Sequence, residues 1–348
     1  MELSRLCEMQ GISGREELVR MAIFRECAEV LGEENVKIDR TGNVIAHKAC
    51  RKADAPRGMV AAHMDEVGLM VINAADDGLL QVRNIGGVDP RVLVSKRVKV
   101  GYDVPVRDGK PAPEALNGVI GAMAIHLQTA EDRKHVLSYD DIYVDIGAKD
   151  KAEAESKCPK GTYITFDTDY VEFGEGCVSA KALDDRVGCY NLLRVLKEEY
   201  PCTVVAVFTS EEEVGCRGAK GAAFAQEPDM GIVLEGTTCN DLGNVPEPEQ
   251  VCKVGAGVAV SFMDRSSIGN RSLFQKALRL GEEQGIACQV KGSVSGGNDA
   301  GEIQLARAGV PTLVLSVPCR SIHSPSSVCK LSDVDAQLAL VQALLKTL

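Results

Sequence analysis

The sequence contains no tryptophan, and aromatic residues make up only 4% of its 348 residues. It also lacks any apolar run near the ~20 residues that would cross a bilayer. Charged residues occur from its first positions, whereas an export signal contains an uncharged apolar segment. A surplus of positive charge is absent as well. The net charge is −11, whereas binding to nucleic-acid backbones by counterion release requires a basic surface. We therefore expect a soluble, cytoplasmic protein that binds neither nucleic acid nor membranes.

The cysteines lack any C-x-x-C spacing, and their number, 13, is odd. In a long chain this pattern favours reduced thiols over a disulfide framework. Cys7, Cys27 and Cys189 fall within apolar helical patterns, and Cys202 precedes an apolar run. We expect these thiols to pack as small hydrophobic side chains and assign no cysteine a chemical role.

Four short apolar runs each lead into polar residues. Residues 59–62 precede His63, 204–208 precede Glu211 to Glu213, 231–234 precede Glu235, and 312–316 precede the segment that ends at His323. Helical patterns occupy 15–31, 185–199, 267–283, 299–308 and 331–348, and a hairpin is predicted over 36–46. This alternation predicts an α/β fold with a mostly parallel sheet that helices cover on both faces.

Residues 70–167 have a different texture. Short β-prone pieces at 79–82, 92–100, 119–121 and 142–144 are broken by Gly, Pro and Asp, with little helical periodicity. Because this region lies between His63 and Asp184, we predict a small β-rich module inserted into the α/β domain. The α/β domain then comprises residues 1–69 and 168–348.

The polar residues at the strand ends are candidates for a metal site, because ligands of such sheets bind beyond the carboxyl ends of the strands. Imidazole and carboxylate groups are ligands for ions such as zinc. A lone histidine is usually an ordinary polar residue, but His63 ends an apolar run, and Asp65 lies on the same face in extended backbone, where its carboxylate can orient the imidazole.

Glu211, Glu212 and Glu213 form a run of acids, which is usually a solvated surface. At the end of a buried strand, however, three carboxylates repel one another, so a bound cation or a shifted pKa is the plausible relief. Adjacent side chains of extended backbone point to opposite sides, which would give one ligand and one general base. Helix capping alone explains one of Asp184 and Asp185. Glu235 and His323 carry weak signals on their own.

Taken together, ordered segments over essentially the whole chain resemble the M42 metallopeptidases, the family of tetrahedral aminopeptidases that includes glutamyl aminopeptidases. The segments are residues 11–16, 62–68, 181–188, 212–219, 296–300, 309–312 and 320–325. The sequence departs from the common pattern at three positions: Glu235, where many relatives have Asp, Asn298, where Thr is frequent, and Ser327, which occupies the position where an acid often follows His-Ser-Pro.

The resemblance implies two divalent metal ions per subunit, zinc or cobalt with manganese also possible. Their ligands would be His63, Asp184, Glu213, Glu235 and His323, with Asp184 bridging the pair and a cis peptide bond after it. Glu212 would be the general base, Asp65 would orient His63, and we assign substrate contacts to Arg320 and Gly297. The implied reaction removes N-terminal residues from peptides with a free N-terminus, using metal-activated water.

The resemblance also implies that the β-rich module mediates dimerisation and that the dimers build a tetrahedral dodecamer. Two alternatives stay open. Paired carboxylates also serve glycoside hydrolases, and some relatives carry endoglucanase labels, but a chain without tryptophan offers poor sugar-stacking platforms. A non-catalytic scaffold is the other alternative, although every ligand and the base are present. The side-chain preference and the native metal are not predicted.

Overall fold

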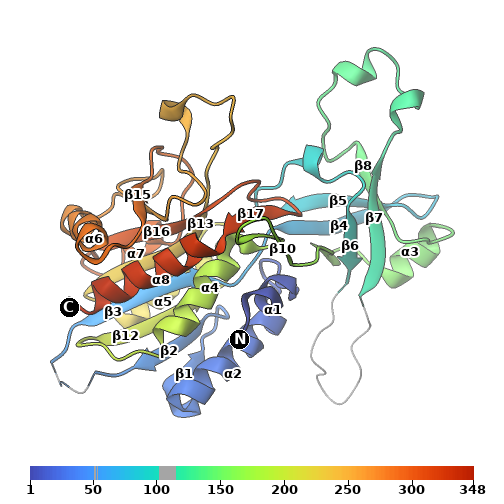
Figure 1. The fold of residues 1–348 in the computed structure, drawn as a ribbon. Helices are drawn as coiled ribbons and strands as arrows, with labels where there is room; N and C mark the ends of the chain where they lie inside the picture. The colour runs from blue at the N-terminus through green and yellow to red at the C-terminus, as the bar shows by residue number, and fades with distance from the viewer. Residues whose placement is uncertain (51, 53, 102–114) are drawn as a thin grey trace.

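The computed structural model describes residues 1–50, 52, 54–101 and 115–348. Its largest sheet has eight strands in the order β1-β2-β12-β3-β13-β16-β14-β15 (Figure 1). Strands β12, β3, β13 and β16 are parallel neighbours, and β14 pairs with β15 in parallel, whereas the β1–β2, β2–β12 and β14–β16 pairs are antiparallel. The predicted α/β fold with a mostly parallel sheet is therefore confirmed. The strand bounds are β1 Val36–Ile38, β2 Val44–Lys48, β3 Arg57–His63, β12 Thr203–Thr209, β13 Met230–Thr238, β14 Val258–Ser261, β15 Cys288–Val290 and β16 Thr312–Cys319.

Helices cover both faces of this sheet, because alternate residues of its buried strands point to opposite sides. In β3, Val60 packs in a cluster with α2 (Glu17–Leu31), α4 (Leu183–Val195), α6 (Arg271–Gln284) and α8 (Leu331–Leu345). Its neighbour Met59 packs in a separate cluster with α5 (Arg217–Gln226) and α7 (Ala300–Ile303). A short helix α1 (Leu3–Glu8) packs beside α4, against strands of a smaller sheet.

All five predicted helices differ from the structure in their bounds. Helix α4 begins two residues before the predicted 185 and ends four before 199, α6 begins four residues after the predicted 267, and α8 ends three residues before 348. Helix α2 begins two residues after the predicted start at Arg15. Helix α7 ends well before the predicted residue 308. Arg307 adopts a left-handed backbone (φ 54°), and Gly309 and Pro311 follow, so the chain turns where the pattern predicted a longer helix.

Residues 68–166 contribute a closed barrel in the strand order β4-β5-β8-β7-β6-β9, which Figure 1 shows beside the large sheet. The barrel has its own buried core, which includes Leu69, Val82 and Ile164. Helix α3 (Lys151–Lys157) also lies in this stretch and was not predicted; the Asp150 carboxylate caps it by accepting a hydrogen bond from the Glu153 amide. The barrel strands are β4 Gly68–Ala74, β5 Leu80–Ile85, β6 Arg97–Val100, β7 Leu116–Ala122, β8 Ile142–Asp145 and β9 Tyr163–Phe166.

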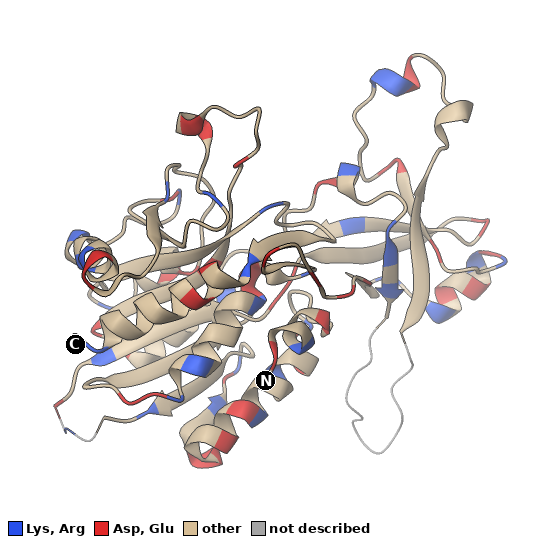
Figure 2. Ribbon diagram, viewed as in Figure 1, with Lys and Arg blue, Asp and Glu red and all other residues tan. Residues whose placement is uncertain are grey.

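A third sheet joins β10 (Val171–Phe173), β11 (Cys177–Ala180) and β17 (Ser327–Lys330). Single 3₁₀ turns occur at Glu33–Asn35, Pro90–Val92, Ile125–Leu127, Asp132–Lys134 and Glu247–Glu249. Lys and Arg are interspersed with Asp and Glu along both the large sheet and the barrel (Figure 2).

All 13 cysteines are free thiols, and Cys7, Cys27, Cys189 and Cys202 are buried as expected. Within the part of the chain that the structure describes, no helix is both long and apolar enough to cross a membrane.

Candidate metal centre

The predicted ligands come from different elements and meet at one edge of the large sheet. His63 is the last residue of β3 and lies level with Thr209, the last residue of β12. Glu213 follows β12, Glu235 lies in β13, and His323 follows β16, the next strand across the sheet. Because β12, β3, β13 and β16 are parallel, their carboxyl ends open at the same edge.

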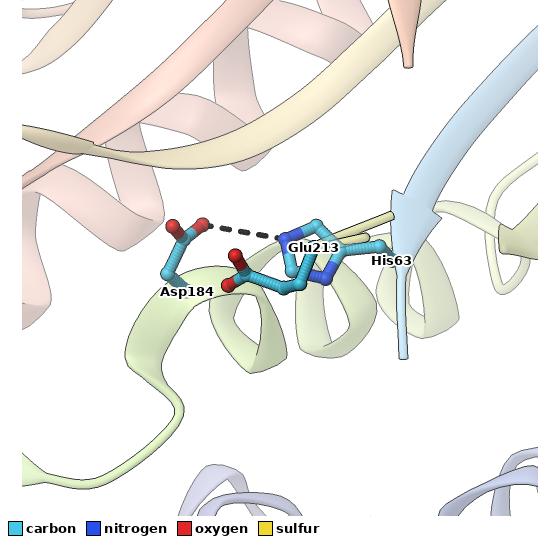
Figure 3. Close-up of side chains that lie close together, drawn as sticks. All are labelled: His63, Asp184 and Glu213. Carbon is cyan, nitrogen blue, oxygen red and sulfur yellow. Dashed lines mark ion pairs between the residues drawn. The ribbon is translucent and has the colours of Figure 1, made fainter. Parts of the chain in front are cut away.

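Asp184 lies between the two histidines. Its Oδ1 is 3.5 Å from Nε2 of His63, and its Oδ2 is 3.4 Å from Nε2 of His323. Glu235 lies on the His63 side, 3.7 Å from that Nε2, and Glu213 lies on the His323 side at 3.4 Å. Figure 3 shows the carboxylates of Asp184 and Glu213 together at the His63 ring. The five predicted ligands therefore form one cluster with Asp184 at its centre.

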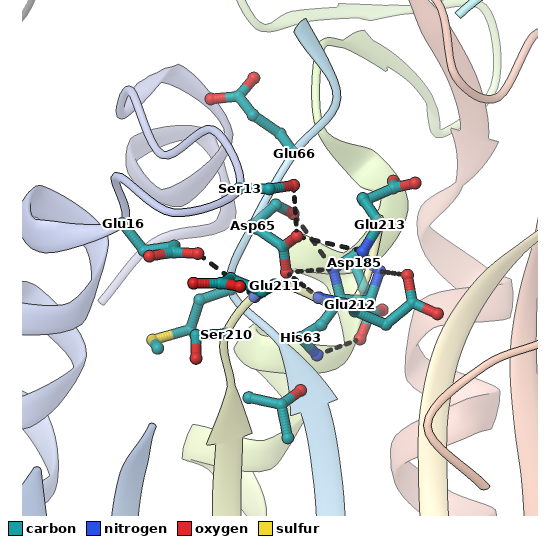
Figure 4. Close-up of polar contacts among 12 residues, drawn as sticks. Ser13, Glu16, His63, Asp65, Glu66, Asp185, Ser210, Glu211, Glu212 and Glu213 are labelled. Atoms are coloured by element: carbon teal, nitrogen blue, oxygen red, sulfur yellow. Dashed lines mark hydrogen bonds and ion pairs between the residues drawn. The ribbon is translucent and has the colours of Figure 1, made fainter. Parts of the chain in front are cut away.

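Asp65 connects the end of β3 to the glutamates after β12 (Figure 4). Its fully buried carboxylate accepts hydrogen bonds from the backbone amides of Glu212 (3.0 Å) and Glu213 (3.1 Å) and from the Ser13 hydroxyl (2.7 Å). One carboxylate oxygen also lies 3.4 Å from Nδ1 of His63. Asp65 is thus positioned to orient both the imidazole and the glutamate segment.

The expectation of extended backbone through the glutamates is wrong. Glu211 has a left-handed backbone (φ 56°), and the amides of Glu212 and Glu213 both donate to Asp65, whereas successive amides of a strand point to opposite sides. The chain turns sharply after β12. Both Glu212 and Glu213 nevertheless line the same cavity as Asp184.

The two adjacent aspartates at the start of α4 have different contacts. The Asp185 carboxylate accepts hydrogen bonds from the backbone amides of Gly188 (3.0 Å) and His63 (3.2 Å), so it is the residue that caps the helix. Asp184 faces the histidines instead, and the bond between Asp184 and Asp185 is cis, as the resemblance implied.

The electrostatics of the cluster show a shortage of positive charge. Burial raises the pKa of Glu212 and of Glu235 well above the usual range, and it raises that of Glu213 to about 7. Burial alone would lower the pKa of His323, but its hydrogen bond with Asp184 and the charge of Glu213 raise it to about 9. Protons on imidazole and carboxyl groups thus offset the excess of acid.

Divalent cations would also offset this excess of negative charge, and the imidazole and carboxylate groups of the cluster are suitable ligands for them. The ligand atoms of His63, Asp184 and Glu213 lie within 4.8 Å of one another. Oε1 of Glu235 is buried and has no hydrogen-bond partner among the described residues, so one lone-pair donor is available on the His63 side. Imidazole and carboxylate groups are the ligands that zinc and similar ions bind.

The cluster opens into a cavity of about 590 Å³. Gly297, a predicted substrate contact, lines this cavity. Arg320 does not line it; its guanidinium makes two hydrogen bonds of 2.7 Å to the Asp241 carboxylate, so we leave Arg320 out of the substrate contacts. None of the described lining residues is Phe, Tyr or Trp, the side chains that commonly stack on sugars.

Three residues at the site were not predicted. The Cys216 thiol donates a 3.4 Å hydrogen bond to Glu212, although the cysteines had been assigned no chemistry. The carboxylate of Asp299, within the recognised segment 296–300, is fully buried. The ligand atoms of Glu212, Cys216 and Asp299 lie within 4.8 Å of one another. Lys291 lines the cavity, and no sequence pattern marked it.

A parallel sheet whose strand ends hold histidines around a shared carboxylate is typical of metal-dependent hydrolases. Residues 42–340 match the family model for M42 glutamyl aminopeptidases, and the chain belongs to this family of peptidases. Family membership and the aminopeptidase class predicted from the sequence are therefore confirmed.

Individual relatives cover nearly the whole chain. The lysyl aminopeptidase of Pyrococcus furiosus is 34% identical, over 99% of this chain and 96% of that protein. The structure of an aminopeptidase from the archaeon Desulfurococcus kamchatkensis is similar with a TM-score of 0.91 and 31% identity, over 99% of this chain and 94% of that one. The TET1 peptidase of Pyrococcus horikoshii, which can assemble into a tetrahedron or a large octahedral shell, has a TM-score of 0.85 and 31% identity, over 99% and 98% of the two chains.

Proposed function

We propose that this chain is a two-metal aminopeptidase. The observation that carries the proposal is the position of Asp184, whose two oxygens face His63 on one side and His323 on the other. His63, Asp184 and Glu235 would hold one ion, and His323, Asp184 and Glu213 the other. Zinc or cobalt suits these donors, and manganese is the next candidate.

The two ions that these residues would hold would supply Lewis acidity for the carbonyl of the first peptide bond and would lower the pKa of a water molecule. Glu212 is the proposed general base, because it lines the cavity next to the cluster and its Oε2 lies 3.9 Å from Nε2 of His63. Glu212 takes a proton from the attacking water and returns it to the leaving amine. Asp65 positions both Glu212 and Glu213 through their backbone amides.

The proposed metal pair supports action on a free N-terminus. One of the two ions held by Asp184, Glu213 and Glu235 would also offer a binding position for the free α-amino group of a peptide. Gly297 lacks a side chain at the cavity wall, so its backbone can approach the peptide closely. An exopeptidase that removes N-terminal residues is the reaction these features favour.

We also propose that residues 70–167 form an inserted dimerisation module within a catalytic domain of residues 1–69 and 168–348. The closed barrel with its own core supports a separable module. The assembly of the related TET1 peptidase supports homo-oligomers, and we propose dimers that build a tetrahedral dodecamer. Thirteen free thiols favour a cytoplasmic location.

The experiment that tests the function is Glu212→Gln, which keeps the side-chain shape and removes the base. We expect kcat on aminoacyl p-nitroanilides to fall at least about 100-fold, the contribution typical of a general base, with metal content and oligomeric state unchanged. Glu211→Gln is the matched control, because Glu211 pairs with Arg217 outside the cavity, and it should stay within a few-fold of the parent. Near-normal turnover by Glu212→Gln would refute the assignment.

A further inference from the structure

A separate group of potential ligands lies beside the candidate metal centre. The ligand atoms of Glu212, Cys216 and Asp299 lie within 4.8 Å of one another. None of the three belongs to the ligand set proposed for the metal pair. Glu212 and Cys216 line the cavity, so an ion from solution can reach the group through it. We call these three side chains the thiol cluster.

The spacing of the thiol cluster suits a tetrahedral ion. Zinc binds a thiolate at about 2.3 Å and a carboxylate oxygen at about 2.0–2.2 Å, so two such ligand atoms of one tetrahedral site lie about 3.5 Å apart. Sγ of Cys216 lies 3.4 Å from Oε1 of Glu212. The Cys216 amide also donates a 2.9 Å hydrogen bond to the Glu212 carbonyl, which fixes the two residues in one turn. An ion that replaces the thiol proton would therefore require little movement of either side chain.

Asp299 supplies the third ligand group. Its carboxylate is fully buried, and Oδ2 accepts a 2.5 Å hydrogen bond from the hydroxyl of Thr209, the last residue of β12. Its other oxygen, Oδ1, is buried and has no hydrogen-bond partner among the described residues. Buried polar atoms of proteins are normally partnered, and each exception calls for an explanation. A cation bound beside Cys216 would satisfy this oxygen.

Glu212 connects the thiol cluster to the candidate metal centre. Its Oε1 accepts the hydrogen bond from the Cys216 thiol, and its Oε2 lies 3.9 Å from Nε2 of His63. Within the described part of the chain, no Lys or Arg forms an ion pair with Glu212 or Asp299. A cation on the Oε1 side would stabilise the Glu212 anion and lower its affinity for a proton. Glu212 would then accept a proton from water less readily.

We propose that the thiol cluster is a third metal site, which takes a thiophilic divalent cation such as zinc or cadmium and inhibits the enzyme when it is filled. The inhibition rests on the proposed function of Glu212 as the general base. On binding, the Cys216 thiol releases its proton to solvent, and the thiolate and the two carboxylates coordinate the ion. The thiolate distinguishes this site from the metal pair, whose imidazole and carboxylate ligands also accept harder ions such as manganese.

The test titrates the cobalt-loaded full chain with Cd²⁺, because a cadmium–thiolate bond gives an ultraviolet charge-transfer band that imidazole and carboxylate ligands do not give. The visible bands of cobalt report whether the metal pair stays in place. We expect the parent to bind about one cadmium ion per subunit at the new site and to lose peptidase activity as the band appears.

Cys216→Ser is the decisive variant, because its hydroxyl can keep the hydrogen bond to Glu212 but is a poor ligand for soft ions. Loss of an outer partner of a metal ligand costs about 10- to 100-fold in affinity, so loss of the thiolate itself should raise the Cd²⁺ concentration for both band and inhibition by at least that factor. Asp299→Asn keeps the thiol and should also weaken binding. Activity is compared with that of each variant before cadmium is added.

Cys177→Ser is the matched control, because Cys177 is a half-buried thiol of β11 that does not line the cavity. It should titrate like the parent. A parent that binds no additional cadmium, or a Cys216→Ser variant with the cadmium affinity and inhibition of the parent, would overturn the proposal. If cadmium binds through Cys216 while turnover continues, the third site stands and the assignment of Glu212 as the base fails. If no anilide is cleaved before cadmium is added, the proposed function fails on its own, and the band and the cadmium content still test the site.

Discussion

Asp65→Asn should separate the positioning of the catalytic residues from the stability of the fold. The Asp65 carboxylate accepts hydrogen bonds from two backbone amides, those of Glu212 and Glu213, on different oxygens. Asparagine has one acceptor oxygen, so whichever way its amide group turns, its NH₂ group faces at least one of these N–H groups. A buried donor left without a partner costs about 1–3 kcal/mol, and bonds to a charged acceptor contribute about 1.5–3 kcal/mol each. We therefore expect a cost of about 2–5 kcal/mol.

The same substitution should impair catalysis through geometry. The repelled amides belong to the proposed base and to a proposed ligand, and a displacement of ~1 Å at a reacting group can cost about 100-fold in rate. We expect Asp65→Asn to lower kcat by about that factor and to lower metal content, measured by elemental analysis. Thermal denaturation reports the stability cost, at about 2–4 °C per kcal/mol in domains of 150–250 residues and less in larger ones.

Asp333→Asn is the matched control. Asp333 is also buried and accepts hydrogen bonds from two backbone amides, those of Gly255 (2.6 Å) and Gly257 (2.8 Å), but it does not line the cavity. It should show a comparable fall in melting temperature while retaining kcat and bound metal at temperatures below its transition. If Asp65→Asn matches this control in every measurement, Asp65 contributes only to the fold and the positioning role is wrong.

Two other predictions concern packing and metal binding. Gly218→Ala should destabilise the protein by about 1–3 kcal/mol, because the new Cβ would lie 2.6 Å from the carbonyl oxygen of Ser210. Gly221→Ala in the same helix should stabilise the protein by about 0.5–1 kcal/mol, because its new Cβ would have no atom within 4 Å. Thermal denaturation measures both changes. His63→Ala should lower the amount of metal bound per subunit, measured by elemental analysis. His135→Ala, at an exposed histidine of the barrel loop, is the control and should leave the metal content unchanged. Equal metal content in both variants would contradict the ligand assignment.

The sequence predicted the large sheet and the clustering of the candidate ligands well because both depend on local patterns. Continuous apolar runs such as residues 204–208 form buried parallel strands, and the residues that follow them reach the same edge of the sheet. His63 and Glu213 could be placed together on that ground alone. Which oxygen of Asp184 faces which histidine depends on the backbone at the start of α4, and only the structure provides it.

Elements with weak patterns were predicted less well. Helix α3 has the sequence Lys-Ala-Glu-Ala-Glu-Ser-Lys, and Ala154 is its one buried residue, so no apolar stripe marked it. The turn at Glu211 was missed for a different reason. Its left-handed backbone is stabilised by distant contacts, including a 3.2 Å hydrogen bond from the Glu211 amide to Glu16, which no local pattern encodes.

Lys291 shows why the full lining of the cavity is harder to predict than the candidate metal ligands. The rule that ligands bind at carboxyl ends of strands applies to β3, β12, β13 and β16, but β14 is antiparallel to β16 and β15 is parallel to β14. Lys291 therefore follows a strand that ends in the direction opposite to the ligand-bearing strands. It reaches the cavity because β14 lies beside β16 at the level of Leu315 and Ser316, and β15 lies beside β14. The predicted metal ligands are constrained by chemistry and by strand direction together, whereas a cavity-lining residue such as Lys291 is constrained only by where the edge strands lie.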